Sequence, residues 1–253
     1  MSNIEWTDET WNPTVGCTKV SPGCKNCYAE TMHARLTAMG QPKYSEPFGV
    51  VKPWPAHLDA PLHWRKPRRV FVNSMSDLFH EGVPDSFIAE VWKRMALVQD
   101  HTFQILTKRS RRMRDYCSEM DVIHVAGRAV PNIWLGVSVE DQQRADERIP
   151  HLLETPAAVR FLSCEPLLGA ADLGGYTHCD LCGYTHQIDW VIAGAESGKG
   201  ARPMDLDWAR SLRDQCMEAC VPFFVKQLCH NGRKIPFGEW PEDLKVREFP
   251  DVR

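Results

Sequence analysis

The chain has 253 residues, of which 43% are hydrophobic and 25% charged, and its formal net charge at pH 7 is −3. This composition is ordinary for a globular protein and excludes disorder, collagen and coiled coil. The mildly acidic balance gives no global basic footprint for nucleic acid. No apolar run approaches the roughly 18–20 residues of a membrane-spanning helix. The N-terminus has no basic or apolar leader region, so we expect a cytoplasmic protein without membrane association.

Short apolar runs alternate with helical patterns along the chain. We expect a first strand before Cys17 and six further strands, at 70–73, 102–107, 133–139, 159–163, 190–194 and 222–226. Helices are predicted over 86–99, over 141–149 with an end at Pro150, and from a cap at Asp205 or Asp207 through Cys220.

This alternation predicts an α/β fold with a parallel sheet, as a partial or complete βα barrel. A doubly wound open sheet is the alternative, although no G-x-G-x-x-G follows the first strand. We assign the barrel to residues 1–230, with a cysteine-containing insertion at about 172–187, and a C-terminal extension to residues 231–253.

The chain contains ten cysteines, which without an export signal indicate metal, cluster or catalytic thiols rather than disulfides. The densest group is Cys17, Cys24 and Cys27, spaced C-x6-C-x2-C in a loop rich in Gly and Pro. Three thiolates here can converge and leave a fourth position open, as in catalytic zinc sites. A 4Fe–4S cluster with one free iron is the second interpretation. A structural zinc site with a distant fourth ligand is the third.

A second candidate metal group lies in the insertion and resembles half a zinc ribbon. It consists of His178, Cys179, Cys182 and His186. Zinc bound at these side chains and solvent-exposed free thiols are both open interpretations. The remaining cysteines are expected to pack as small hydrophobic side chains, with Cys216 and Cys220 on one face of a helix.

Polar side chains follow nearly every predicted strand. Because the carboxyl ends of parallel strands meet at one face, these residues are expected to gather there. Capping of the following helices explains single residues but not the charges taken together. The candidates are Ser74, Ser76, Asp77, Lys108, Arg109, Glu140, Glu165, Glu196 and Lys226.

Longer motifs run in order through most of residues 1–230. They cover 12–30, 70–80 (VFVNSMSDLFH), 106–109 (LTKR), 134–140 (WLGVSVE), 160–169 (RFLSCEPLLG), 191–198 (VIAGAESG), 201–204 (ARPM) and 222–227 (PFFVKQ). In these motifs the chain resembles an uncharacterised family of phage and prophage proteins with a three-cysteine motif. That family is itself similar to radical S-adenosylmethionine (SAM) enzymes, which have a TIM-barrel type of fold, and particularly to the spore photoproduct lyase-like branch.

The resemblance implies a 4Fe–4S cluster held by Cys17, Cys24 and Cys27, with SAM bound at the open iron and cleaved to a 5′-deoxyadenosyl radical. It implies that Ser74, Ser76 or Asp77 receives the methionine amino group and that Lys108 or Arg109 pairs with the methionine carboxylate. Glu140 would hold a ribose hydroxyl, because a carboxylate accepts from hydroxyl donors. Glu165, Glu196 and Lys226 remain as catalytic residues toward the substrate.

Two basic stretches, 65–69 and 108–114, can hold phosphates even on a mildly acidic protein. Trp54, His63 and Trp64 stand near the first stretch and can stack on bases. Together with the resemblance, they favour a nucleic acid or nucleotide substrate, with an electron donor such as flavodoxin or ferredoxin. A zinc-dependent hydrolase on a βα barrel and a non-catalytic metal-stabilised binding protein are the alternatives. The oligomeric state stays open.

Overall fold

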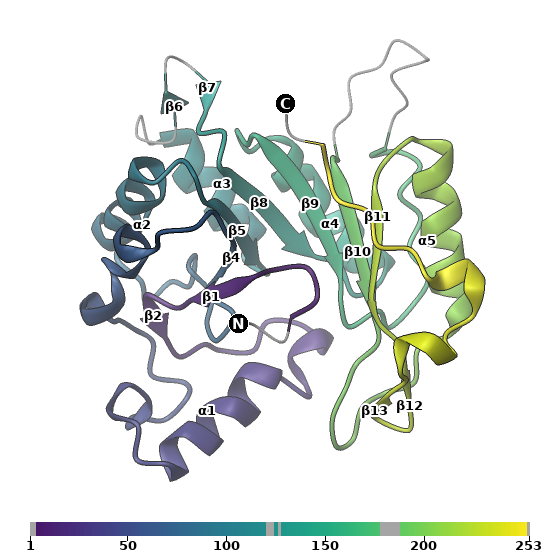
Figure 1. The fold of residues 1–253 in the computed structure, drawn as a ribbon, viewed down its shortest axis with the longest axis horizontal. Helices are drawn as coiled ribbons and strands as arrows, with labels where there is room; N and C mark the ends of the chain where they lie inside the picture. The colour runs from purple at the N-terminus through teal and green to yellow at the C-terminus, as the bar shows by residue number, and fades with distance from the viewer. Residues whose placement is uncertain (1–3, 120–123, 126–127, 178–187, 252–253) are drawn as a thin grey trace. The chain divides into compact units, whose positions relative to one another are not determined.

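The structure, a computed structural model, describes residues 4–119, 124–125, 128–177 and 188–251. Its main sheet has seven strands in the order β1-β4-β5-β8-β9-β10-β11 (Figure 1). These strands are β1 Glu9–Trp11, β4 Arg69–Val72, β5 Thr102–Thr107, β8 Ile133–Ser138, β9 Val159–Cys164, β10 Trp190–Gly194 and β11 Phe223–Gln227.

The strand order confirms the predicted α/β fold and decides between the two predicted architectures. The order follows the chain without reversal, as in βα barrels, whereas a doubly wound sheet reverses direction at a switch point. The two ends of the order are β1 and β11, so the sheet is open and corresponds to a partial barrel.

Five α-helices occur in the described ranges, and none of them has the length and apolar character to cross a bilayer. They are α1 Tyr28–Ala38, α2 Asp85–Leu97, α3 Ser110–Glu119, α4 Gln142–Leu153 and α5 Leu206–Glu218. The predicted helices correspond to α2, α4 and α5, while α1 and α3 were not predicted. Only Ala29 and His33 of α1 are buried, so the sequence of this helix needs no apolar stripe and shows no clear one.

The prediction that Pro150 ends a helix is wrong, because Pro150 lies inside α4. A proline within a helix loses one backbone hydrogen bond and crowds the preceding turn. The apolar face of α4 continues past it, since Ala145, Ile149 and Leu152 are all fully buried. Burial of Leu152 therefore extends the helix beyond the proline.

The prediction that α5 continues through Cys220 is also wrong. The helix ends at Glu218, and Cys220 is exposed with a left-handed φ of 56°. The amide of Cys220 donates to Met217 O and the amide of Val221 donates to Cys216 O, which is the hydrogen-bond pattern of a Schellman cap. Cysteine occupies the position that glycine usually takes, so the sequence carried no stop signal. Of the predicted pair only Cys216 packs in the core.

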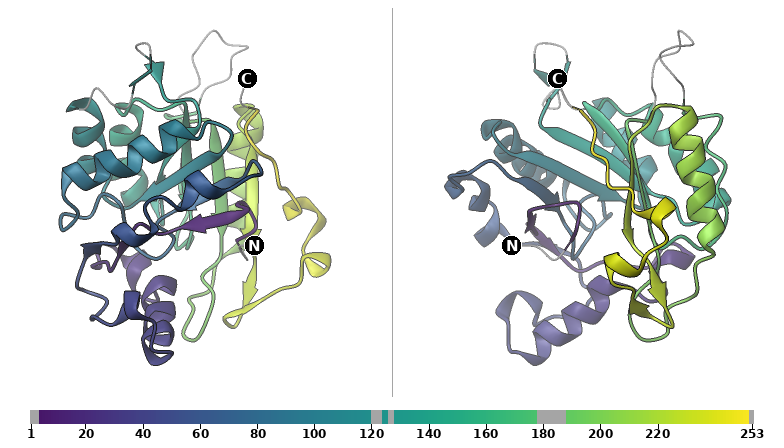
Figure 2. Two further views of the ribbon diagram at one scale, coloured as in Figure 1. Left: turned by 60° about the vertical axis from the view of Figure 1, so that its left-hand side comes forward. Right: turned by 45° about the vertical axis from the view of Figure 1, so that its right-hand side comes forward.

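The first of two compact units comprises residues 1–135 and 154–158. In it β1, β4 and β5 pair in parallel, and Val70, Val72, Phe103 and Ile105 are fully buried. Between β1 and β4 in the chain, β2 Thr14–Val15 and β3 Lys52–Pro53 form a short antiparallel pair. Figures 1 and 2 show α1 at the margin of this unit, beyond β1 and β2.

The second unit comprises residues 136–153 and 159–253. Here β9, β10 and β11 pair in parallel, and α5 packs along β10 and β11 (Figure 1). Every residue of β10 is buried, as expected for a strand that is covered on both faces. The predicted C-terminal extension follows β11: the amide of Val225 donates to Val246 O and the amide of Glu248 donates to Phe223 O.

Candidate functional site

One loop of the first unit carries the three closely spaced cysteines. It leaves β2 at Gly16 and passes through a 3-10 turn, Pro22–Cys24, to Cys27, the N-cap residue of α1. Gly16 has φ of +83°, and a Cβ at this position would lie 2.2 Å from Val50 O. Only glycine fits such a backbone. The cysteine loop therefore begins at a fixed position beside the residues that follow β4, because Gly16 bridges to Ser76.

The three thiols are free and partly accessible. Burial, followed by the nearby Asp77 carboxylate, raises the pKa of Cys17 to about 11, and Arg109 opposes this shift. Among the residues that the structure describes, no three His, Cys, Asp or Glu side chains are assembled around one point as a metal site. Thiolates suit iron–sulfur clusters and zinc. The loop therefore fits such a group by donor type and spacing, and the thiols would have to turn toward one point to bind it.

Arg109 connects the cysteine loop to the ends of β4 and β5. Its side chain is 5% exposed, and its Nη1 donates to Cys17 Sγ at 3.7 Å and to Asp77 Oδ2 at 3.2 Å. Its Nη2 donates to the carbonyl and hydroxyl oxygens of Thr18, at 3.3 and 2.9 Å, and its Nε donates to Glu81 at 2.9 Å. With all these donors engaged, Arg109 holds residues 17 and 18 in place.

His80 supports the same loop from the segment after β4. The amide of Gly82 donates to His80 Nδ1 at 2.9 Å, so the ring proton is assigned to Nε2, which then donates to Thr18 Oγ1 at 2.8 Å. Burial, followed by the charge of Arg109, lowers the pKa of His80. The neutral ring is therefore the form that holds Thr18.

Asp77 is the centre of the polar group after β4. Its Oδ1 accepts from the Phe79 amide and from Thr107 Oγ1, at 3.0 and 2.7 Å. Its Oδ2 accepts from the Lys108 amide and from Arg109, both at 3.2 Å. The side chain is 8% exposed and bonded at both oxygens, so it braces the ends of β4 and β5.

The two predicted serines bond to Asn12, which lies between β1 and β2, and to Thr14 in β2. Ser74 Oγ lies 3.3 Å from the Asn12 side chain, and Ser76 Oγ lies 2.9 Å from Thr14 Oγ1. The structure thus brings Ser74, Ser76, Asp77, Lys108 and Arg109 together near the cysteine loop, mostly bonded to their neighbours. Their roles toward a methionine moiety stay predictions.

The second unit holds the other predicted site residues, Glu140, Glu165, Glu196 and Lys226. Lys226, near the end of β11, donates to both carboxylate oxygens of Glu165, at 2.6 and 2.8 Å. Gln227 Nε2 donates to Glu165 at 3.3 Å and to Ala195 O at 2.7 Å. The lysine and the glutamate are 16% and 18% exposed, so this acid–base pair keeps some access to solvent.

The two other glutamates of this unit are bound by arginines. Arg148 on α4 donates to Glu140 at 2.9 Å, and both side chains are fully buried. Arg202 donates to both carboxylate oxygens of Glu196, at 2.5 and 3.0 Å. Glu140 therefore lies in the interior, and its predicted contact with a ribose hydroxyl is untested.

Sequence reasoning missed the partners of the predicted residues. These are Thr18, His80, Glu81, Arg148, Arg202 and Gln227. Four of them stand inside the motifs given above, which was the available signal: Thr18 in 12–30, His80 in 70–80, Arg202 in 201–204 and Gln227 in 222–227. The second candidate metal group, His178, Cys179, Cys182 and His186, lies outside the described residues.

Residues 1–242 match the family model described as "Protein of unknown function (DUF5131)". The chain belongs to the DUF5131 family. A search of curated proteins found no match for this DUF5131 member. Among solved structures it is similar to a spore photoproduct lyase variant with bound AdoMet and a dinucleoside spore photoproduct, with a TM-score of 0.40 and 10% identity. That alignment covers 83% of this chain and 61% of the lyase chain, so the DUF5131 chain spans about three-fifths of the lyase's length.

Proposed function

We propose that this DUF5131 protein is a radical SAM enzyme that holds a 4Fe–4S cluster through Cys17, Cys24 and Cys27. The observation that carries the proposal is the cysteine loop itself: three free, accessible thiols on a stretch of eleven residues that Arg109 fastens to the carboxyl ends of β4 and β5. Active sites of βα barrels lie at the carboxyl ends of their strands. Three thiolates leave one iron of such a cluster without a protein ligand.

When bound, the cluster supplies one electron for reductive cleavage of the sulfonium of SAM. The chain's own residues would position the groups around it. Gly16, Arg109 and Thr18 fix the start of the loop, and the hydrogen bond from Arg109 to Cys17 Sγ is of the kind that tunes iron–sulfur potentials. Ser74, Ser76 and Lys108 are proposed to face SAM.

The acid–base pair of the second unit is proposed to serve the substrate. Lys226 Nζ donates a hydrogen bond to Glu165 Oε1 at 2.6 Å, and both side chains keep access to solvent. We propose a nucleic acid or nucleotide substrate and a flavodoxin- or ferredoxin-type electron donor. In the basic stretch at 108–114, Arg111 is 79% exposed and supports a phosphate-bearing substrate. Arg112 and Arg114 are engaged with carboxylates.

Anaerobic purification followed by iron, sulfide and zinc analysis tests the proposal. We expect a brown protein with about four irons per chain. Cys24→Ala should lose the iron and the visible absorbance, whereas the matched control Cys220→Ser, which changes an exposed thiol outside the loop, should keep both. Circular dichroism of both variants establishes that they are folded. Colourless protein with zinc would replace the proposal by the zinc-hydrolase or binding-protein alternatives, and protein without either metal would refute all three.

A second measurement separates an enzyme from a protein that merely holds a cluster. The reduced, iron-loaded protein incubated with SAM should release 5′-deoxyadenosine. An iron-loaded protein that releases none after reduction would contradict the catalytic part of the proposal and leave the cluster intact.

A further inference from the structure

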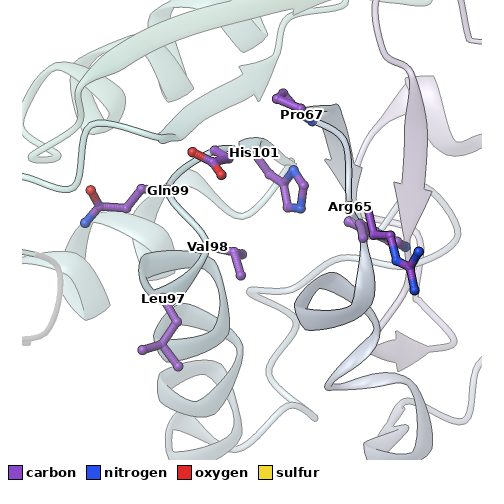
Figure 3. A pocket seen from close by; sticks show the side chains of 8 residues that line it. Arg65, Pro67, Leu97, Val98, Gln99 and His101 are labelled. Carbon is purple, nitrogen blue, oxygen red and sulfur yellow. The ribbon is translucent and has the colours of Figure 1, made fainter.

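A pocket of about 400 Å³ lies in the first unit, away from the cysteine loop (Figure 3). Its walls are the segment before β4, with Trp64, Arg65 and Pro67, and the connection from α2 to β5, with Val98 and His101. Both segments precede their strands, whereas Asp77 and Arg109 follow the same strands. The pocket is therefore at the amino-terminal edge of β4 and β5, opposite to the candidate metal centre.

One wall of the pocket is held rigidly by Asn132. The amide group of Asn132 donates to Met95 O and His101 O at 2.9 Å each, and to Val98 O at 3.3 Å. The amide of His101 donates to Val98 O at 3.1 Å. These bonds fix the turn that carries His101 before any ligand arrives.

His101 brings an unused polar atom to this pocket. The residue is only 3% exposed, and its Nδ1 is buried without a hydrogen-bond partner among the described residues. Figure 3 shows its imidazole projecting into the space between Val98 and Arg65. Buried polar atoms in folded proteins are almost always bonded, so this nitrogen calls for a ligand atom or an ordered water.

Trp64 adds an aromatic surface beside the imidazole. The two rings meet edge to face with centroids 5.5 Å apart, and the Arg68 guanidinium lies 5.5 Å from the indole centroid. Arg68 is itself paired with Glu9 at 2.7 Å, so its charge is already balanced. The indole is thereby held in one orientation, as a stacking platform requires.

Arg65 supplies positive charge to the lining. It is exposed and makes no ion pair with any residue of the described ranges. Asp100 also lines the pocket. Beside this carboxylate the pocket offers an aromatic wall, one unbonded imidazole nitrogen and one exposed cation. A ligand that uses all three has a flat ring with hydrogen-bonding atoms on its edge and an anionic group.

We infer that this pocket binds a nucleoside phosphate, either as a free nucleotide or as one unit of a single strand. The base stacks beside Trp64, and its edge, which carries donors and acceptors side by side, satisfies His101 Nδ1 in either tautomer. The phosphate pairs with Arg65. The inference does not depend on the cluster, and its failure leaves the proposed radical SAM activity untouched.

Calorimetric titration of the full chain with AMP, adenosine, ribose 5-phosphate and a ten-residue oligodeoxyadenylate tests the inference. AMP should bind more tightly than adenosine or ribose 5-phosphate. Trp64→Leu and Arg65→Gln should each weaken AMP binding about tenfold or more. The matched control Arg111→Gln, which changes an exposed arginine on α3, should leave the affinity unchanged.

The ratio of AMP to oligonucleotide affinity identifies the source of the ligand, because a strand site prefers the oligonucleotide. Arg65→Gln changes only an exposed side chain, so its result stands even if Trp64→Leu fails to fold. The inference is overturned if neither AMP nor the oligonucleotide binds at millimolar concentration. It is equally overturned if Arg65→Gln leaves binding intact.

Discussion

Replacing Arg148 by methionine should destabilise the protein strongly, because it removes the arginine that pairs with the buried Glu140 carboxylate. The ion pair spans 2.9 Å between side chains that are 1% and 0% exposed, and the same nitrogen also donates to Ser138 O at 2.9 Å. At an effective dielectric constant near 20, the Coulomb attraction is about 6 kcal/mol. Desolvation offsets part of it, and breaking such a pair costs roughly 3–5 kcal/mol. Since domains are stable by about 5–15 kcal/mol, the loss is large.

Urea unfolding followed by circular dichroism measures the effect. Arg144→Met is the matched control on α4, since Arg144 pairs with the exposed Glu147, and it should cost under about 1 kcal/mol. The double variant Glu140→Gln and Arg148→Met removes both charges and should recover much of the loss. A cost below about 1 kcal/mol for Arg148→Met alone would refute this reasoning. It would indicate that the Glu140 carboxylate does not require Arg148 and is available to a ligand.

Three further perturbations follow from contacts of the first unit. Arg109→Gln should lower the free energy of unfolding by roughly 3 kcal/mol, because it removes the ion pair of the buried Asp77. Its control Glu81→Gln changes a carboxylate that is 68% exposed and should cost under about 1 kcal/mol. Equal urea midpoints for the two variants would contradict a stabilising role of the Arg109–Asp77 pair. Gly16→Ala should cost at least about 1–2 kcal/mol from its left-handed backbone alone, whereas Gly49→Ala, where a Cβ meets nothing within 4 Å, should be nearly neutral. Burial lowers the pKa of Lys43 from 10.5 to about 8. Between these two pH values the unfolded chain binds more protons than the folded chain, so the free energy of unfolding should rise with pH. Relative to Lys43→Met, the rise should reach up to roughly 3 kcal/mol. Parallel stability curves of wild type and Lys43→Met from pH 7.5 to 10 would disprove that burial shifts this lysine.

Strands were predictable where burial is continuous. The predicted strand 190–194 coincides with β10, and the predicted strand 133–139 exceeds β8 by one residue; every residue of both strands is buried. Runs that are covered by structure on both faces need no alternating pattern, and their apolar composition alone marks them. Helices were less predictable where packing is slight, as in α1, or where an apolar face continues past a breaker, as at Pro150.

The strand-end rule also predicted which polar residues gather in the first unit. It selected Asp77 and Arg109, 32 residues apart, and the structure pairs them at 3.2 Å. It did not predict that these groups would bond to one another, because the choice of partner depends on side-chain geometry in three dimensions. Arg148 shows this most clearly, since a helix arginine in the sequence gives no sign that it is buried against Glu140.

Helix α1 has a consequence for how the proposed cluster would affect the folding of this protein. Its N-cap residue is Cys27, which makes no side-chain capping bond, and the helix buries only Ala29 and His33. A helix this lightly packed gains little stability of its own. Metal bound at Cys27 would therefore add its binding energy to the folding of α1. If the loop holds the proposed cluster, loading of the site and resistance of residues 28–38 to proteolysis rise together.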